Sequence, residues 1–154
     1  MKKNEPMLSN ACKYGIRSIL YLAMHAEKEE KIGVKNIAEA LEAPQPFLAK
    51  LLVQLAKNKL VSSFKGPTGG FFLDKENLEN SVWDVIKCID GTDKFEQCFM
   101  GLSTCGDENP CPVHFTVVPF KKKILNDFKD KTLKEFVDEI KLKGRYISLK
   151  DLEV

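Results

Sequence analysis

The segment of residues 65–69, which reads Lys-Gly-Pro-Thr-Gly, restricts the fold of this chain more than any other feature. It separates two short apolar runs, residues 60–64 and 70–73, and its glycines and proline favour a tight turn. We therefore predict two short strands joined as a hairpin. Before them, apolar residues repeat at three- and four-residue steps in the segments 9–25, 34–41 and 46–58, which predicts three helices.

Three short helices followed by a hairpin form the order of a winged helix-turn-helix. In that architecture the third helix enters the major groove of DNA and the hairpin, called the wing, touches the flanking backbone or minor groove. The expected fold is therefore mainly α with a small two-stranded β-wing. A three-helix packing domain with a hairpin that never contacts DNA is the alternative that this pattern leaves open.

Beyond the wing, the chain is predicted to form three more helices around a long irregular loop. Ser81 can cap a helix over residues 82–89, periodicity disappears over residues 92–112, and Thr132 and Glu135 form a capping box for a last helix. The intervening helix carries a narrow apolar seam of the kind that packs against another helix. Its members are Val113, Val117, Phe120, Ile124 and Phe128.

The start of this seam helix is ambiguous because Pro119 lies within it. If the helix begins at Pro112, then Pro119 is an interior proline and should kink the helix. If it begins near Pro119, His114 belongs to the preceding loop. We favour the kinked helix.

Charge is unevenly distributed along the chain. The formal net charge is +2, but residues 1–70 carry +5 and residues 71–154 carry −3. No acidic residue occurs between Glu42 and Asp74, a stretch that holds four lysines. This stretch could face a polyanion, or it could be an ordinary solvated surface.

The same stretch supplies candidate DNA contacts. Lys50, Gln54 and Lys57 fall on the polar side of the third helix, Gln45 stands at its start, and Lys65 lies at the wing tip. Lysine neutralises phosphate, and glutamine can pair with adenine through two hydrogen bonds. Glycines in the wing would let the backbone approach phosphates closely. They are Gly66, Gly69 and Gly70.

Three cysteines and one histidine cluster in the irregular loop. Six residues separate Cys98 from Cys105, five separate Cys105 from Cys111, and His114 follows closely. Thiolate and imidazole ligands at these spacings can fold around one metal centre, because they suit iron–sulfur clusters and zinc. A metal-free thiol sensor is a further alternative.

Other features argue against an enzyme or a membrane protein. The longest apolar run, Ile19–Met24, is far shorter than the roughly 18 residues of a membrane span, and we expect a cytoplasmic location. With two histidines and no nucleophile beside a base, no catalytic site or small-molecule substrate is indicated. A thiol oxidoreductase would need a Cys-x-x-Cys pair, which the sequence lacks.

The run from Phe47 to Phe71 resembles the recognition helix and wing of the bacterial regulator family that includes IscR, NsrR, RirA and CymR. Further similar positions are Lys13-Tyr14-Gly15, Ile37-Ala38-Glu39 and Thr132-Leu133, so the resemblance covers about residues 8–140. It implies a homodimeric transcription factor that binds a double-stranded, palindromic DNA operator. Residues 1–80 would form the DNA-binding domain, and residues 81–154 would form the cluster-binding loop and the helical dimerisation region.

The resemblance also assigns roles to single residues. Lys13 and Ala49 match DNA-contacting positions, but members similar to IscR can carry a glutamate where Ala49 stands, so their operator cannot be transferred to this chain. Cys98, Cys105, Cys111 and His114 match the ligands of a 2Fe-2S cluster, although the first spacing is six where five is usual. A 4Fe-4S cluster, as in members similar to NsrR, and zinc are the alternatives. Members similar to CymR also act through a protein partner.

Overall fold

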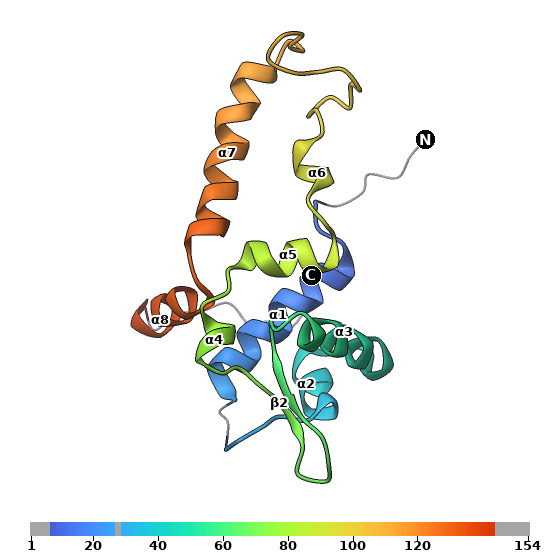
Figure 1. Cartoon of the computed structure of the whole chain (residues 1–154), viewed down its shortest axis with the longest axis vertical. Helices are drawn as coiled ribbons and strands as arrows, with labels where there is room; N and C mark the ends of the chain where they lie inside the picture. Colours follow the sequence, from blue (N-terminus) through green and yellow to red (C-terminus); the bar gives the residue numbers. More distant parts are fainter. Residues whose placement is uncertain (1–6, 27–28, 144–154) are drawn as a thin grey trace.

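The computed structural model describes residues 7–26 and 29–143, and it contains the predicted helices and hairpin in the predicted order. Helices α1 (Asn10–His25), α2 (Val34–Leu41) and α3 (Gln45–Lys57) form one body (Figure 1). Strands β1 (Ser62–Phe64) and β2 (Gly70–Phe72) pair antiparallel, with Ser62 opposite Phe72. The predicted fold, mainly α with a two-stranded β-wing, is confirmed.

Helix α1 begins where its capping residue predicts. The Ser9 side chain accepts a hydrogen bond from the backbone N–H of Cys12 at 3.0 Å. Such a cap satisfies one of the free N–H groups at a helix start. The Ser9 backbone N–H in turn donates to the Asp90 carboxylate at 2.8 Å, which joins the start of α1 to the end of a later helix.

A single apolar core lies between these helices and two later ones. Its fully buried members come from the apolar faces that helical periodicity identifies, as the hydrophobic effect requires. The largest of them are Ile19, Leu22, Ile37, Leu41, Leu48, Leu52, Leu55, Ile86 and Leu133.

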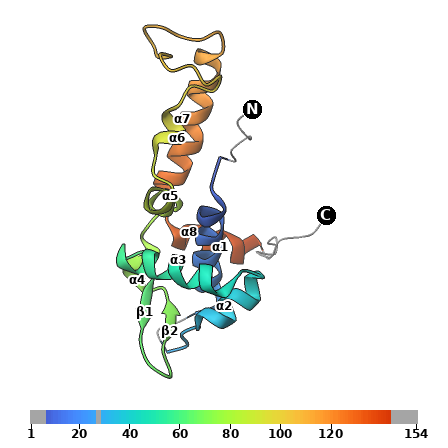
Figure 2. The ribbon, with the colours of Figure 1, turned by 90° about the vertical axis from the view of Figure 1, so that its right-hand side faces the viewer.

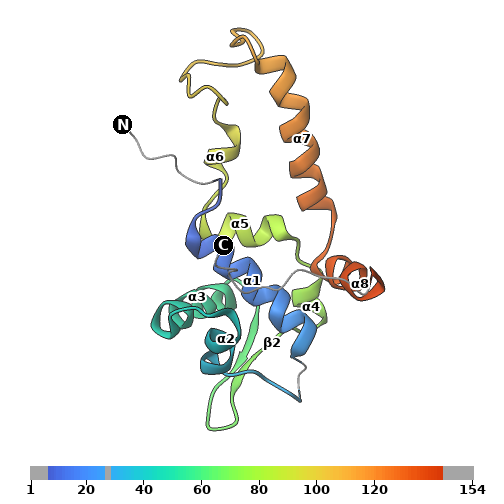
Figure 3. The ribbon, with the colours of Figure 1, turned by 180° about the vertical axis from the view of Figure 1, so that it is seen from behind.

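The second half of the chain builds an arm on this body. Helix α5 (Val82–Ile89) lies across the body, α6 (Asp93–Glu96) continues from its C-terminal end, and α7 (His114–Asp130) stands on the other side (Figures 1 and 3). The side view shows the wing and the loop between α6 and α7 at opposite ends of the molecule (Figure 2). Helices α4 (Lys75–Leu78) and α8 (Leu133–Lys143) complete the fold.

Most of the predicted elements of this half are present. Helix α5 has the predicted bounds, and the Thr132 hydroxyl accepts from the Glu135 N–H at 3.1 Å in the predicted capping box of α8. Helix α7 contains Pro119, as the favoured prediction requires, and it begins at His114 rather than at Pro112. Helices α4 and α6 were not predicted, because four residues are too few to show periodicity.

Helix α7 has no buried residue among its 17, which distinguishes it from α1, α2, α3, α5 and α8. Within the described residues, no helix is long and apolar enough to cross a membrane.

A buried asparagine ties the base of the wing to the end of α3. Asn77 is 4% exposed, and its Oδ1 accepts from the Ser62 hydroxyl at 2.7 Å and from the Asp74 N–H at 3.0 Å. Its Nδ2 donates to the carbonyl of Lys59 at 2.9 Å. Asn77 therefore satisfies polar groups in three segments at once: the residues that follow α3, strand β1 and the N-terminal cap of α4.

We expect Asn77→Asp to lower the free energy of unfolding by about 2–3 kcal/mol, because it replaces a buried donor by an acceptor and adds a charge beside Asp74. Urea unfolding followed by far-UV circular dichroism measures the change. The same substitution at Asn126, which is exposed on α7, is the control and should change stability by less than about 0.5 kcal/mol. Equal effects at the two positions would contradict the role given to Asn77.

Candidate metal centre and DNA-contacting surface

The structure brings together the three cysteines that the sequence singled out. Cys98 follows α6, and Cys105 and Cys111 lie in the loop before α7. Their three sulfur atoms lie within 4.8 Å of one another, with 3.7 Å between the Sγ atoms of Cys98 and Cys111. All three are free thiols. A loop of irregular backbone thus folds its only thiols into one cluster.

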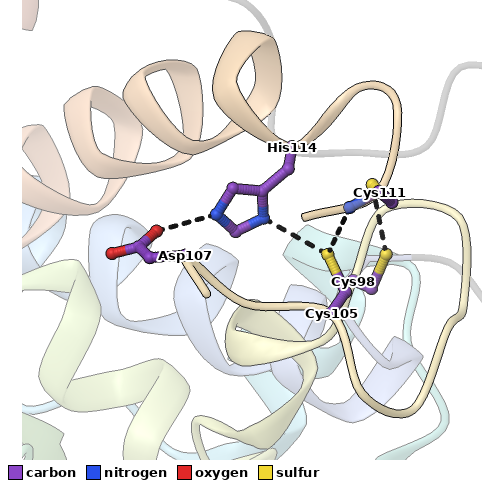
Figure 4. Close-up of polar contacts among 5 residues, drawn as sticks. All are labelled: Cys98, Cys105, Asp107, Cys111 and His114. Carbon is purple, nitrogen blue, oxygen red and sulfur yellow. Dashed lines mark hydrogen bonds and ion pairs between the residues drawn. The ribbon is translucent and has the colours of Figure 1, made fainter. Parts of the chain in front are cut away.

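His114 joins this cluster from the first turn of α7. Its Nδ1 lies 3.2 Å from the Sγ of Cys105, and its Nε2 lies 2.8 Å from Oδ1 of Asp107 (Figure 4). The hydrogen bond to His114 holds the pKa of the Asp107 carboxyl below its usual value. The sequence does not identify Asp107 as part of this site, because it is a carboxylate that contacts a candidate ligand and does not itself belong to the cysteine and histidine set.

The environment of the thiols shifts the pKa values of Cys98 and Cys105 in opposite directions. The pKa of Cys98 is lowered to about 7, because the backbone amides of Leu102 and Met100 donate to its sulfur. The pKa of Cys105 is raised: a hydrogen bond from the Cys111 amide lowers it, but burial and the two neighbouring thiols outweigh that effect. Since metals bind the thiolate form, these opposite shifts favour Cys98 over Cys105 as a thiolate at neutral pH.

The donor set fits a metal centre. With a metal–sulfur distance near 2.3 Å, a tetrahedral site has sulfur–sulfur edges of about 3.8 Å. The separation of 3.7 Å between Cys98 and Cys111 matches that edge. Three thiols and one imidazole also complete the four protein ligands that a 2Fe-2S cluster needs.

A pocket of about 190 Å³ adjoins these donors, and residues of α6, of α7 and of the loop between them line it. Part of this lining is apolar, and an apolar shell around a site tunes the potential of a bound metal. Two lysines of α7, Lys121 and Lys122, and the acidic Glu96 of α6 also line it. The apolar residues are Phe95, Phe99, Val117, Val118 and Leu125.

Cys12 and Cys88 lie outside this cluster. Cys12 is fully buried in the core, and burial raises its pKa to about 12, with a further contribution from Asp90. Cys88 is partly buried, which also raises its pKa. Neither thiol is prepared for metal binding or oxidation.

The predicted DNA-contacting side chains lie on α1, on α3 and in the wing, and the wing is at the opposite end of the molecule from the loop that carries the thiols (Figure 2). Lys50, Lys57 and Lys65 are exposed, and none of them forms an ion pair with another described residue. Lys13 and Gln45 are also exposed, and Ala49 is half-buried. These lysines are therefore available to neutralise phosphates, and their contacts with DNA remain predictions.

Gln54 has a different environment from the other predicted contacts. Its Nε2 donates to the carbonyl of Cys88 at 3.1 Å, at the C-terminal end of α5. The last carbonyls of a helix lack partners within the helix, so this side chain satisfies one of them. Gln54 thus connects the predicted recognition helix to the arm that carries the thiols.

The wing glycines have packing roles that the sequence could not show. A Cβ at Gly69 would lie 2.1 Å from the carbonyl oxygen of Phe64, and one at Gly70 would lie 2.8 Å from the backbone of Ile32. Gly66 has a φ of +116°, which disfavours other residues. Ile32 also pairs with Phe71, so the wing has an additional bridge at its edge.

The predicted dimerisation seam is divided between several environments. Val117 lines the metal pocket, and Phe128 packs against the core of its own chain. Phe120 is 64% exposed, and Phe115, which the seam did not include, is 66% exposed. Val113 and Ile124 are half-buried. Phe115 and Phe120 are therefore the large apolar side chains that α7 exposes most, and the role of the seam in dimerisation stays a prediction.

Comparisons with known proteins agree with this architecture. Residues 8–139 match the Rrf2 family model, described as an iron-dependent transcriptional regulator. An Aquifex aeolicus protein whose name places it among HTH-type transcriptional regulators is 34% identical over 134 residues, which are 86% of this chain and 92% of that protein. IscR of Serratia proteamaculans is 28% identical over 131 residues, which are 85% of this chain and 79% of that protein.

Solved structures show the same fold. CymR, the global cysteine regulator of B. subtilis, superposes with a TM-score of 0.67 at 21% identity, over 90% of this chain and 98% of that one. IscR of T. potens superposes with a TM-score of 0.66 at 24% identity, over 91% of this chain and 92% of that one.

Fold and comparisons together define a winged helix-turn-helix DNA-binding transcriptional regulator and not an enzyme. More specifically, the chain belongs to the Rrf2 family of transcriptional regulators. The family predicted from the residues of α3 and the wing is therefore confirmed.

Proposed function

We propose that this protein is a homodimeric regulator whose affinity for DNA is set by an iron–sulfur cluster, held by Cys98, Cys105, Cys111 and His114. The observation that carries the proposal is the convergence of these four donors at one end of a chain whose other end is a winged helix-turn-helix. Such a cluster supplies a centre that responds to oxidants and to iron supply.

A continuous set of contacts connects the donors to α3. Phe95 of α6 packs edge-on against the Trp83 ring of α5, with 5.1 Å between the ring centroids. Trp83 is 8% exposed, and the carbonyl of Cys88 on the same helix accepts from Gln54. Movement of the loop after α6 can therefore reach the recognition helix through α5.

Dimerisation through α7 would give this movement a consequence for DNA binding. Phe115 and Phe120 are exposed on a helix without buried residues, as expected for a helix that packs on a second copy. In a two-fold dimer, the distance between the two recognition helices sets the half-site spacing, about one helical turn of DNA or a multiple of it. The operator should then be palindromic.

Zinc is the second candidate for this site. The separation of 3.7 Å between the sulfurs of Cys98 and Cys111 is that of a single tetrahedral ion. A zinc centre would hold the loop and α7 in place. The protein would then regulate transcription without responding to redox state.

The test compares DNA binding by the metal-loaded and the metal-free protein. Under anaerobic conditions, a duplex selected from a random pool with the loaded protein is titrated with both forms by fluorescence anisotropy. We expect at least a fivefold difference in Kd between the forms, a typical size for allosteric coupling. We also expect log K to fall linearly with log salt, because lysines release counterions from phosphates.

Lys50→Ala and Lys123→Ala provide a matched pair for this test, since both lysines are exposed on helices and only Lys50 lies on the predicted DNA surface. Lys50→Ala should weaken binding and reduce the salt slope by about one, whereas Lys123→Ala should change neither. Equal affinity of the loaded and metal-free forms would refute control by the cluster.

A further inference from the structure

We propose that Asp107 is a positioning residue of the metal centre: its carboxylate fixes the tautomer and the ring orientation of His114, so that Nδ1 faces the metal. The inference rests on the proposed function, because it concerns the same donor set.

The two nitrogens of His114 have different partners. Nε2 lies 2.8 Å from Oδ1 of Asp107, and Nδ1 lies 3.2 Å from Sγ of Cys105 (Figure 4). A carboxylate only accepts hydrogen bonds, so Nε2 must carry the hydrogen. The neutral ring then has its lone pair on Nδ1, which points to the thiols and is free to bind a metal.

The loop holds Asp107 in the place that this role requires. Gly106 and Asn109 exchange two backbone hydrogen bonds, at 3.2 and 3.1 Å, and so close a tight turn around Asp107. The Asn109 side chain is 3.4 Å from the carbonyl of Thr104, next to Cys105. The turn therefore fixes the carboxylate relative to the cysteine on the other side of the imidazole.

The environment of the ring also restricts its rotation. The side chain of His114 is 11% exposed, although that of Asp107 is 87% exposed. The Phe115 ring packs edge-on against the imidazole, with centroids 5.0 Å apart. A ring rotated to present Nε2 to the thiols would lose the bond to Asp107. Carboxylates that bond to a ligating histidine in this way typically contribute roughly 10- to 100-fold to metal affinity.

The test uses Co²⁺ as the probe, because its visible spectrum reports thiolate and imidazole ligation. Full-length protein, stripped of metal under reducing anaerobic conditions, is titrated with Co²⁺ in competition with a chelator. We expect Asp107→Ala to bind Co²⁺ roughly 10- to 100-fold more weakly than wild type. Asp107→Asn keeps an acceptor oxygen and should recover most of this loss.

Glu108→Ala is the matched control, because it removes the same charge from the neighbouring exposed position of the same loop. It should bind Co²⁺ as wild type does. If Asp107→Ala binds Co²⁺ as tightly as Glu108→Ala, the hydrogen bond from His114 to Asp107 does not contribute to metal affinity and the inference is wrong.

A second measurement identifies the ligating nitrogen. In the zinc-loaded wild type with ¹⁵N-labelled histidine, a long-range ¹H–¹⁵N spectrum should show His114 with a protonated Nε2 and a metal-bound Nδ1. Metal on Nε2 would overturn the inference while leaving the four-donor site intact. Wild-type protein that binds no Co²⁺ through thiolates would overturn the proposed metal site together with the inference.

Discussion

Cys105→Ala is expected to empty the metal centre. Cys105 is central to the donor set, since its sulfur contacts His114 Nδ1 at 3.2 Å and the backbone N–H of Cys111 at 3.4 Å. Its loss leaves three donors and removes the sulfur that faces the imidazole. Bound metal should fall from near one centre per chain to background, measured as iron, sulfide and zinc in anaerobically purified protein together with the visible spectrum.

Cys88→Ala is the control for this prediction, because Cys88 lies on α5 and takes no part in the thiol cluster. It should retain the metal content of wild type. Iron and sulfide in equal amounts would identify a cluster, and zinc alone would identify the structural ion. Full metal content in Cys105→Ala would show that other groups hold the metal. The far-UV spectrum should be unchanged, because Cys105 lies outside the core cluster.

Leu52→Ala should produce the largest loss of stability. Leu52 is fully buried on α3, so its truncation removes apolar contacts and leaves a cavity. Losses of about 2–5 kcal/mol are typical of such changes, and they are a large share of the roughly 5–15 kcal/mol that stabilise a domain. Urea unfolding at one fixed protein concentration measures this loss, since the stability of a self-associating protein depends on its concentration.

The adjacent residue on α3 provides the control. Val53 is 49% exposed, and Val53→Ala should change the free energy of unfolding by less than about 0.5 kcal/mol. A similar loss in both variants would mean that α3 does not present the observed face to the core.

Several features could be predicted from the sequence because they depend on local chemistry. The period of apolar residues predicted which faces of α1, α2 and α3 are buried. The capping residues Ser9 and Ser81 predicted where α1 and α5 begin. Spacing alone also grouped Cys98 with the other two loop thiols. These signals suffice because caps, turns and amphipathic faces involve residues close in sequence.

Other features depend on contacts between residues far apart in sequence. Gln54 is predicted from its helix face to contact a base, and only the structure shows that it also bonds to the carbonyl of Cys88, 34 residues away. Phe128 fits a dimer seam by its period, yet it packs against its own core, because period specifies a face and not the partner of that face. The same limit applies to Val117, which lines the metal pocket.

The sequence by itself therefore determined the order of the predicted helices, the wing and the family, and it indicated the four candidate donors. Only the tertiary structure decided that Asp107 bonds to His114 and that Gln54 connects α3 to α5. The physical reason is that a side chain's hydrogen bonds depend on which distant groups the packed backbone brings within about 3 Å. Periodicity and spacing carry no information about those distances.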